Sequence, residues 1–301
     1  MVLRTLLYVL CTNVLLRIGT CHPGRQIAYP TPRPDSIPLR FLPEIIPADK
    51  LHFCTAFSAD GKQVFFGRGE KGAWQLYALT LEDTGRTAPQ LAPFCETGYS
   101  QADPFVTADG TLYFISNRPV HPADTLPDYN IWRTRPQGEG KWSAPEYIEA
   151  VNSDSTEYYV SVAGNGNLYF SSNRQGGFGG LDLYVSEFVN GVFTAPKNLG
   201  APVNTPGDEH DPLITPNEDD LVFTSDRAGG YGQADLYYSR RSGGHWSIPE
   251  NMGNRINTPT YEYCPNFSPD GKYFFYSSEF TIKWMESKYL PFYTRSVANK
   301  K

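Results

Sequence analysis

Carboxylates recur in this chain at a regular interval, which places them at equivalent positions of a repeated unit. Glu157, Glu209 and Glu262 follow one another at steps of 52 and 53 residues. Carboxylates that converge on a cleft can coordinate a cation or focus a negative potential that attracts a basic peptide. A pair about 5 to 9 Å apart can also act on a glycosidic bond. The spacing therefore suggests cation binding, peptide binding or carbohydrate chemistry.

The sequence between these glutamates repeats as well. Residues 173–183, Asn-Arg-Gln-Gly-Gly-Phe-Gly-Gly-Leu-Asp-Leu, return at 226–236 as Asp-Arg-Ala-Gly-Gly-Tyr-Gly-Gln-Ala-Asp-Leu. We count five copies, each with four short runs of β-branched and aromatic residues separated by Asp-Gly, Asn-Gly or Gly-Gly turns. A period near fifty residues is typical of solenoids, propellers and arrays.

Each copy reads as one four-stranded antiparallel sheet. Such sheets bury their faces by stacking on each other, and closing the stack into a ring leaves only short edges. We therefore predict an all-β fold, a five-bladed β-propeller with four-stranded blades. The segment 36–41 repeats the fourth-strand pattern of 247–252, whereas the fifth copy has no fourth strand of its own. The N-terminal strand should therefore close the ring, and a sixth blade from residues 280–301 is the alternative.

The beginning of the chain differs from the repeats. Residues 1–20 are mostly apolar after Arg4 and end in small residues before Cys21, as in a signal or lipoprotein leader. A plain apolar leader or a misplaced start is the alternative. Residues 21–35 contain several prolines and read as a linker, which leaves 36–301 for the propeller. Cys21 would be the site of a lipid anchor, and it would be the chain's only attachment to a membrane.

The overall charge excludes one class of partner. A formal net charge of −6 and a pI near 5.4 do not suit a nucleic-acid-binding surface, which must be basic. We expect a monomer with no nucleic-acid partner.

The repeat predicts a ring of side chains around the central channel. The residues that begin the innermost strands should line its rim, joined by those two positions further along, which strand alternation would point the same way. The candidate ligand-binding residues are His52, Gln101, Asp103, Glu157, Glu209, Asp211 and Glu262. A structural role is the alternative, in which the glutamates accept hydrogen bonds from nearby backbone amides and Ser or Thr residues and join neighbouring blades.

Two cysteines interrupt this ring. Cys54 and Cys264 occupy equivalent positions in the first and fifth copies, which become neighbours if the ring closes. A disulfide, a soft-metal site that includes His52, and two buried thiols all fit this placement. Because no CxxC or HxxxH spacing accompanies them, we predict no metal and no cofactor. Cys95 would remain unpaired if a disulfide forms.

Arginines and aromatics also recur. Arg174 and Arg227 adjoin the glycine loops, and Asp182 and Asp235 follow eight residues later. We predict structural ion pairs Arg174–Asp182 and Arg227–Asp235, with an anion-binding loop as the alternative. The outer-strand aromatics are expected to pack blade against blade rather than bind sugars; they are Trp142, Phe193 and Trp246.

These motifs carry a resemblance to a known family. The order Glu-x-x-Pro, Asp-Gly, Tyr-Phe-x-Ser-x-Arg-x-Gly-Gly and Asp-Leu-Tyr resembles the TolB-type, WD-like β-propeller repeat of bacterial envelope proteins, over residues 36–290. The resemblance implies an exported protein, periplasmic or associated with the outer membrane, whose propeller binds another envelope protein or a peptide.

No catalytic motif accompanies the repeats. The chain lacks a Gly-x-Ser-x-Gly elbow, a His-Glu-x-x-His motif and a phosphate-binding loop. We therefore predict a non-enzymatic protein-interaction scaffold. The alternative is a carbohydrate-active enzyme, either a glycosidase or a uronate lyase, that uses acidic residues at the channel mouth together with His210.

Overall fold

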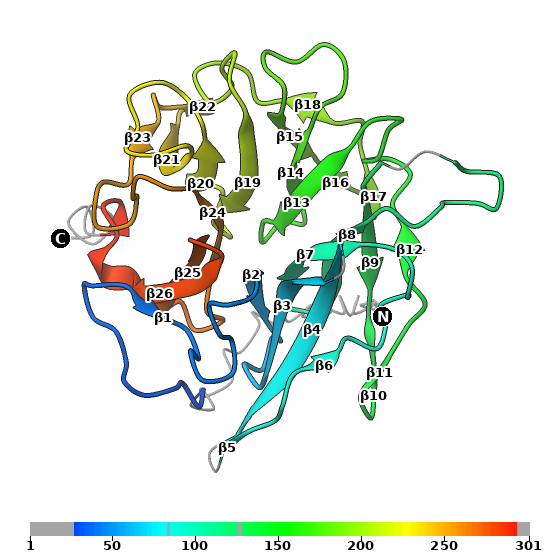
Figure 1. Ribbon diagram of the computed structural model, residues 1–301. Helices are drawn as coiled ribbons and strands as arrows, with labels where there is room; N and C mark the ends of the chain where they lie inside the picture. Colours follow the sequence, from blue (N-terminus) through cyan, green and yellow to red (C-terminus); the bar gives the residue numbers. More distant parts are fainter. Residues whose placement is uncertain (1–26, 71, 83–84, 126–127, 294–301) are drawn as a thin grey trace, which may run out of the picture.

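The computed structural model describes residues 27–70, 72–82, 85–125 and 128–293. Across these ranges the chain consists of short β-strands, and its one helical element is the 3₁₀ turn η1 (Ser287–Tyr289). The strands build five four-stranded antiparallel blades around a central axis (Figure 1). The prediction of five blades is confirmed. The segment proposed for a sixth blade supplies a strand to the fifth instead.

The first three blades have these strands, from the axis outward. Blade one contains β2 (His52–Phe57), β3 (Gln63–Glu70), β4 (Ala73–Glu82) and β6 (Gln90–Leu91). Blade two contains β7 (Gln101–Val106), β8 (Leu112–Ser116), β9 (Asn130–Thr134) and β12 (Glu146–Tyr147). Blade three contains β13 (Glu157–Val162), β14 (Leu168–Ser172), β15 (Asp182–Ser186) and β18 (Lys197–Asn198).

The last two blades follow the same order. Blade four contains β19 (Glu209–Ile214), β20 (Asp220–Ser225), β21 (Asp235–Ser242) and β23 (Glu250–Asn251). Blade five contains β24 (Glu262–Phe267), β25 (Tyr273–Ser278), β26 (Thr281–Glu286) and β1 (Leu39–Arg40). Short pairings extend the rim; they are β5 (Gly85–Arg86) on β4, β10 (Pro136–Gly138) with β11 (Lys141–Trp142), β16 (Phe188–Val189) with β17 (Val192–Phe193), and β22 (His245–Trp246) on β21.

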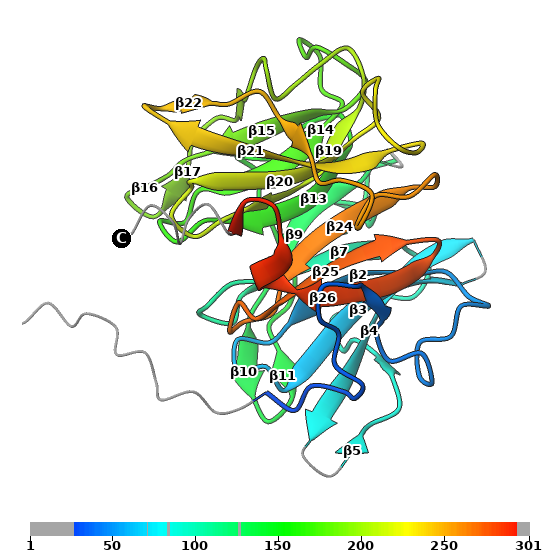
Figure 2. The ribbon, with the colours of Figure 1, turned by 90° about the vertical axis from the view of Figure 1, so that its left-hand side faces the viewer.

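The N-terminal strand closes the ring, as predicted. Strand β1 pairs antiparallel with β26, and Figure 2 shows the two side by side. Strand β2 contacts the innermost strands of both neighbouring blades, β7 and β24. Phe41 is fully buried and packs edge-on against Phe275 and Trp284, with ring centroids 5.1 and 5.5 Å apart. Aromatic packing therefore reinforces the two-residue strand pairing at the closure.

Part of the expected linker belongs to this closure. Ile27 and Tyr29 are buried, and the Tyr29 hydroxyl donates a 2.7 Å hydrogen bond to Asp270 of blade five. The side chains of Ile27 and Tyr29 pack into a hydrophobic cluster of the propeller, so this part of the segment is not a free linker. The predicted leader at residues 1–20 and the predicted anchor Cys21 lie outside the described residues.

Large aromatic side chains fill the spaces between blades. Trp142 of blade two, for example, packs on Phe65 and Phe94 of the first repeat, with centroids 5.7 and 5.3 Å apart. This is the inter-blade packing expected for the outer aromatics. Among the described residues, no helix has the length and apolarity needed to span a membrane.

Candidate functional site

The repeated glutamates are structural, and the prediction that they line the channel is wrong. Glu209 is fully buried and accepts hydrogen bonds from the backbone N–H and hydroxyl of Thr205, at 2.6 and 2.7 Å, and from Ser225. Glu157 and Glu262 make the equivalent contacts in their blades. Each carboxylate therefore ties the loop that enters its blade to the second strand.

The other two residues at this repeat position are also turned away from the channel. The Nδ1 atom of His52 lies 3.1 Å from the carbonyl oxygens of Pro47 and Lys50. Gln101 is fully buried and contacts the backbone of Glu96 and Tyr99. The whole set serves the entry loops because a buried polar side chain must satisfy its hydrogen bonds locally.

The predicted arginine partners are also wrong. Arg174 binds Glu157 at 2.8 Å rather than Asp182, and Arg227 binds Glu209 at 3.2 Å rather than Asp235. Each guanidinium also lies over two aromatic rings of its own sheet, at 5.0 to 5.2 Å from their centroids.

The two aspartates have another role. Asp182 accepts the backbone N–H groups of Phe178 and Gly179, and Asp235 does the same for Tyr231 and Gly232. The glycine loops fold back over these two carboxylates. The backbone N–H groups of each loop therefore donate to the aspartate, and the arginine pairs with the glutamate instead.

A bulge in every innermost strand builds the centre of the molecule. The third residue of each of these strands has a φ between 35° and 54°, and the register shifts beside it. The five residues are Cys54, Asp103, Tyr159, Asp211 and Cys264. A bulge breaks the alternation of side chains along a strand. These residues therefore face the axis while the glutamates two positions earlier do not, contrary to the predicted common direction.

The five bulge side chains form a plug across the channel. Tyr159 donates a hydrogen bond from its hydroxyl to the Pro265 carbonyl, 2.5 Å away on blade five. Asp211 accepts the backbone N–H of Cys264 at 2.9 Å, and Asp103 accepts that of Tyr159. We call the set Cys54, Asp103, Tyr159, Asp211 and Cys264 the central plug.

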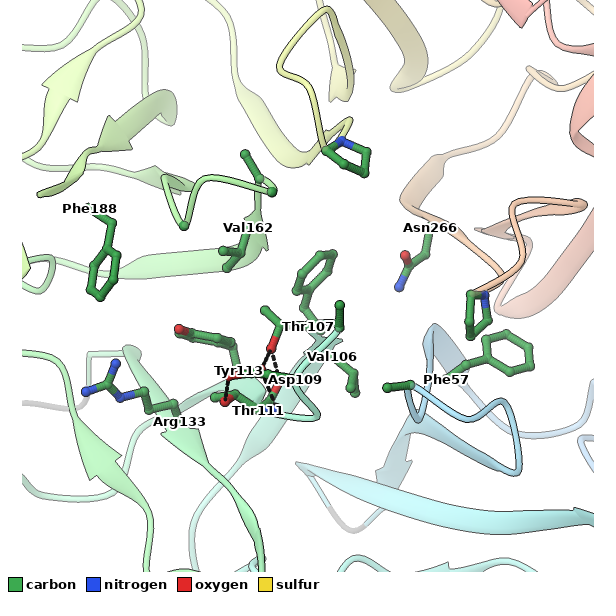
Figure 3. A pocket seen from close by; sticks show the side chains of 18 of the residues that line it. Phe57, Val106, Thr107, Asp109, Thr111, Tyr113, Arg133, Val162, Phe188 and Asn266 are labelled. Atoms are coloured by element: carbon green, nitrogen blue, oxygen red, sulfur yellow. Dashed lines mark hydrogen bonds between the residues drawn. The ribbon is translucent and has the colours of Figure 1, made fainter. Parts of the chain in front are cut away.

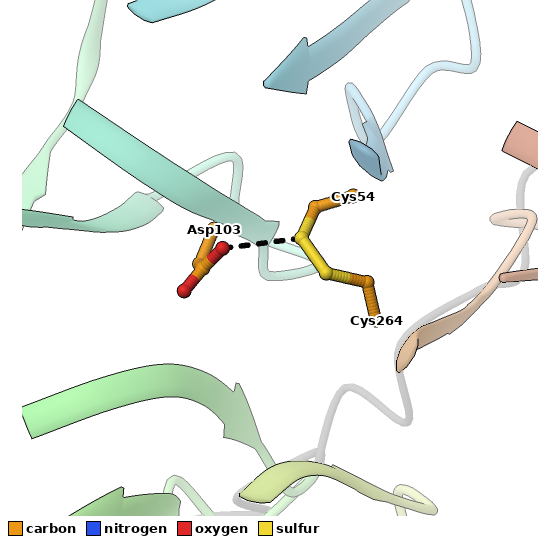
Figure 4. Close-up of side chains that lie close together, drawn as sticks. All are labelled: Cys54, Asp103 and Cys264. Carbon is orange, nitrogen blue, oxygen red and sulfur yellow. Dashed lines mark hydrogen bonds between the residues drawn. A yellow bond between two sulfur atoms is a disulfide. The ribbon is translucent and has the colours of Figure 1, made fainter. Parts of the chain in front are cut away.

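The structure joins the two cysteines of the plug by a disulfide between blades one and five, with their Cα atoms 4.9 Å apart. The Sγ atom of Cys54 lies 3.1 Å from Oδ1 of Asp103, as Figure 4 shows. Cys95 is a free, half-buried thiol. The disulfide thus spans the seam where the ring closes.

The central plug separates two cavities that have no lining residue in common. The far cavity, of about 590 Å³, lies where the innermost strands end and is lined by apolar residues such as Phe57 and Val162 and by polar ones such as Asp109 and Arg133 (Figure 3). The cavity at the other end, which we call the channel mouth, has a volume of about 360 Å³. Its acidic lining residues are Asp103, Asp208 and Asp211, and its aromatic ones include Trp74, Tyr158, Tyr261 and Tyr263.

The residues that begin the innermost strands do not line the channel mouth. Much of the wall comes from the position between each glutamate and each bulge residue, which supplies Phe53, Tyr158, His210 and Tyr263. The mixture of residue types at this repeat position was the available signal, because scaffold positions keep their residue type from copy to copy. Trp74 and Tyr261 carry no such signal, since they come from outside the innermost strands.

A histidine and a carboxylate form an ion pair in this wall. Nδ1 of His210 lies 3.1 Å from Asp211, and Nε2 lies 2.5 Å from the Tyr261 hydroxyl. Burial alone would lower the pKa of His210, but the charge and hydrogen bond of Asp211 outweigh it and raise the pKa. Burial, followed by the charge of Asp211, raises the pKa of Asp103 well above its usual range. Burial and charge in the mouth therefore favour the neutral form of Asp103 and the protonated form of His210.

We expect stability to depend on the protonation of His210. Because its folded pKa is raised, the ion pair contributes fully below the unfolded value of about 6.5, and the contribution is lost as pH rises through the folded pKa. Replacing Asp211 by asparagine should lower the pKa of His210, as measured by NMR titration of the imidazole. Asp219→Asn, an exposed change at the other end of the blade, should leave it unchanged. An unmoved His210 titration in Asp211→Asn would contradict the pairing.

Comparisons with known proteins found similarity among solved structures. No protein-family model and no curated protein matches the chain. Among solved structures, a protein of unknown function from Dyadobacter fermentans aligns with a TM-score of 0.49 and 16% identity, over 86% of this chain and 84% of that one. TolB from Acinetobacter baumannii aligns at 0.47 and 15%, over 79% and 55%, so this chain spans about half the TolB length.

A gluconolactonase from Xanthomonas campestris aligns at 0.47 and 12% identity, over 88% of this chain and 98% of its own. At these identities and TM-scores the alignments carry no further argument about this chain. The strand order and the bulges of this chain define it as a five-bladed β-propeller whose channel is closed by the central plug.

Proposed function

We propose that this protein is a non-enzymatic binding propeller of the bacterial envelope, and that its channel mouth receives a basic side chain from a protein or peptide partner. One observation carries the proposal: three aspartates, Asp103, Asp208 and Asp211, lie in one small cavity with aromatic walls. Asp208 lies outside the His210–Asp211 pair, and a carboxylate in such a cleft focuses a negative potential. The faces of Trp and Tyr rings add attraction for a lysine or arginine.

The size of the mouth supports a side chain as the ligand. A volume of about 360 Å³ is at the lower end of the range for small-ligand sites, so the mouth suits one inserted group better than a folded domain. Placement outside the cytosol is supported by the apolar leader pattern and by the disulfide, which persists in oxidising compartments. The resemblance of the repeats to TolB-type propellers points the same way.

Peptide binding tests the proposal directly. We expect the oxidised protein to bind a lysine- and arginine-rich peptide, but not a glutamate-rich one, in isothermal titration calorimetry. Affinity should fall in Asp211→Asn, which removes a carboxylate of the mouth. It should fall about 2- to 30-fold in Trp74→Ala, since a cation over an aromatic ring contributes about 0.5 to 2 kcal/mol and about 1.4 kcal/mol corresponds to tenfold. Asp109→Asn is the matched control, because Asp109 lines the far cavity. If Asp109→Asn alone lost binding, the ligand would bind in the far cavity, which would contradict the proposal.

One observation favours a second candidate, a carbohydrate-active enzyme. Asp103, with its raised pKa, shares the mouth with Asp211 and His210, which is a set suited to general acid and base chemistry. The repeated glutamates are fully engaged in hydrogen bonds, so they would not take part. Turnover of an acidic glycan that disappears in Asp211→Asn, in a protein that binds no basic peptide, would reverse the ranking.

A further inference from the structure

We propose that reduction of the Cys54–Cys264 disulfide converts the floor of the channel mouth into a site for a soft divalent cation such as Zn²⁺, held by the two thiolates and the Asp103 carboxylate. This site is separate from the proposed capture of a basic side chain, which requires no metal. The proposal rests on three groups that come from three different strands, β2, β7 and β24, and meet at one point.

The geometry fits one ion. One ligand atom from each of the three residues lies within 4.8 Å of the other two. Zinc binds thiolate sulfur at about 2.3 Å and carboxylate oxygen at about 2.0 to 2.2 Å, so tetrahedral ligands lie roughly 3.5 to 4 Å apart. Opening the disulfide lets the two sulfurs move to this separation without a change in the backbone, whose Cα atoms are 4.9 Å apart.

The backbone is already arranged around this point. All three residues have a positive φ at the bulge, which turns their side chains towards the axis. The N–H of Cys54 donates to the Ser277 hydroxyl at 3.0 Å, and the N–H of Cys264 donates to Asp211 at 2.9 Å. Outer contacts of this kind orient the ligands of metal sites. The fold therefore holds the backbone of the three ligand residues in place before a metal ion binds.

The site would keep one open coordination position. Cys264 and Asp103 line the channel mouth, so a bound ion would face that cavity and could take up water or a partner group there. His52 does not belong to this group of ligand atoms, and its Nδ1 atom is directed to the carbonyls of Pro47 and Lys50. The proposed site thus differs from the soft-metal alternative raised by the sequence, which included His52.

A dithiol reductant can open the Cys54–Cys264 disulfide by thiol–disulfide exchange. A thiolate of the reductant attacks one sulfur, the S–S bond breaks, and the other cysteine leaves as a thiolate. The second thiol of the reductant then resolves the mixed disulfide, releases the remaining cysteine and becomes a cyclic disulfide. Binding of the divalent ion displaces the protons of the two thiols, together with the proton of Asp103 where that carboxyl group is protonated. Exchange with a disulfide oxidant, which takes up the two electrons and becomes a dithiol, would re-form the disulfide and release the ion.

Cobalt binding to the full-length chain tests the site. Protein reduced with dithiothreitol, then freed of reductant under argon, is titrated with Co²⁺, whose bonds to thiolate give a charge-transfer band in the near ultraviolet. We expect one equivalent to bind to the reduced protein and none at this site in the oxidised protein. Zn²⁺ should displace the Co²⁺ and abolish the band.

Three variants identify the ligands. Cys264→Ser and Asp103→Asn should each weaken binding at least about tenfold, because even outer-shell changes lower metal affinity by about 10 to 100-fold. Cys95→Ser is the matched control and should bind like the wild type, since Cys95 contacts the Leu76 carbonyl away from the plug. Asp103→Asn keeps both cysteines, so it tests the site even if Cys264→Ser fails to fold.

Two results would overturn the proposal. One is a reduced wild-type protein without the charge-transfer band. The other is a band that persists in a Cys54→Ser/Cys264→Ser double variant, which retains the chain's remaining cysteines, Cys11, Cys21 and Cys95. Peptide binding is measured on the oxidised, metal-free protein, so failure of one proposal leaves the other standing.

Discussion

Replacing Glu209 by alanine should lower the free energy of unfolding by about 3 to 5 kcal/mol. The change leaves the Arg227 guanidinium without its carboxylate and leaves the backbone N–H of Thr205 without an acceptor. Both groups are largely buried, so water replaces the lost contacts poorly. Urea denaturation followed by tryptophan fluorescence measures the effect.

The matched control is Glu187→Ala. Glu187 forms an exposed ion pair with Lys197 at 3.1 Å, and such pairs contribute no more than about 1 kcal/mol. Glu187→Ala should therefore unfold close to the wild-type urea concentration. Equal effects of the two variants would show that the repeated glutamates are ordinary surface carboxylates and that the hydrogen-bonded network does not stabilise the blades.

Replacing Phe41 by alanine should destabilise the protein by a similar amount, about 3 to 5 kcal/mol. Phe41 is the buried anchor of the closing segment and packs against Phe57, Phe275 and Trp284. Its removal leaves a cavity between blades one and five, and a closing strand of two residues cannot compensate for it. An opened ring would expose the edge of β26, and exposed edges promote aggregation.

Ile37→Ala provides the comparison, because Ile37 lies in the same segment but is 68% exposed. Surface changes of this kind usually alter stability by less than about 0.5 kcal/mol. Thermal unfolding monitored by circular dichroism, with light scattering for aggregation, distinguishes the two variants. A Phe41→Ala protein as stable as Ile37→Ala would mean that the disulfide alone holds the ring closed.

Sites and scaffold occupy different positions of the same repeat. The hydrogen bonds of Glu157, Glu209 and Glu262 are the same from blade to blade because each glutamate holds the entry loop of its blade in the same way. The central plug has no such constraint, since its five residues meet only once, on the axis. Chemistry is therefore concentrated where the copies differ, in the plug and in the wall of the channel mouth.

Much of the architecture was readable along the chain. The period near fifty residues, the turn residues and the fourth-strand pattern at 36–41 predicted five blades and the way they close. The equivalence of Cys54 and Cys264 predicted that they are neighbours. These inferences hold because blade structure depends on local turns and on burial periodicity, both of which repeat with the sequence.

The directions of the side chains could not be predicted from the sequence in the same way. Strand alternation predicted that Glu209 and Asp211 face the same side, yet the bulge sends one into the blade and the other to the axis. Likewise, Arg174 is closer in sequence to Asp182 than to Glu157, but the glycine loop occupies Asp182 with its own amides. A positive φ and the choice between competing partners follow from how five sheets pack around one axis. Local sequence patterns carry no information about either. The repeat therefore predicted the ring of blades, whereas the tertiary structure decided which side chains meet at its centre.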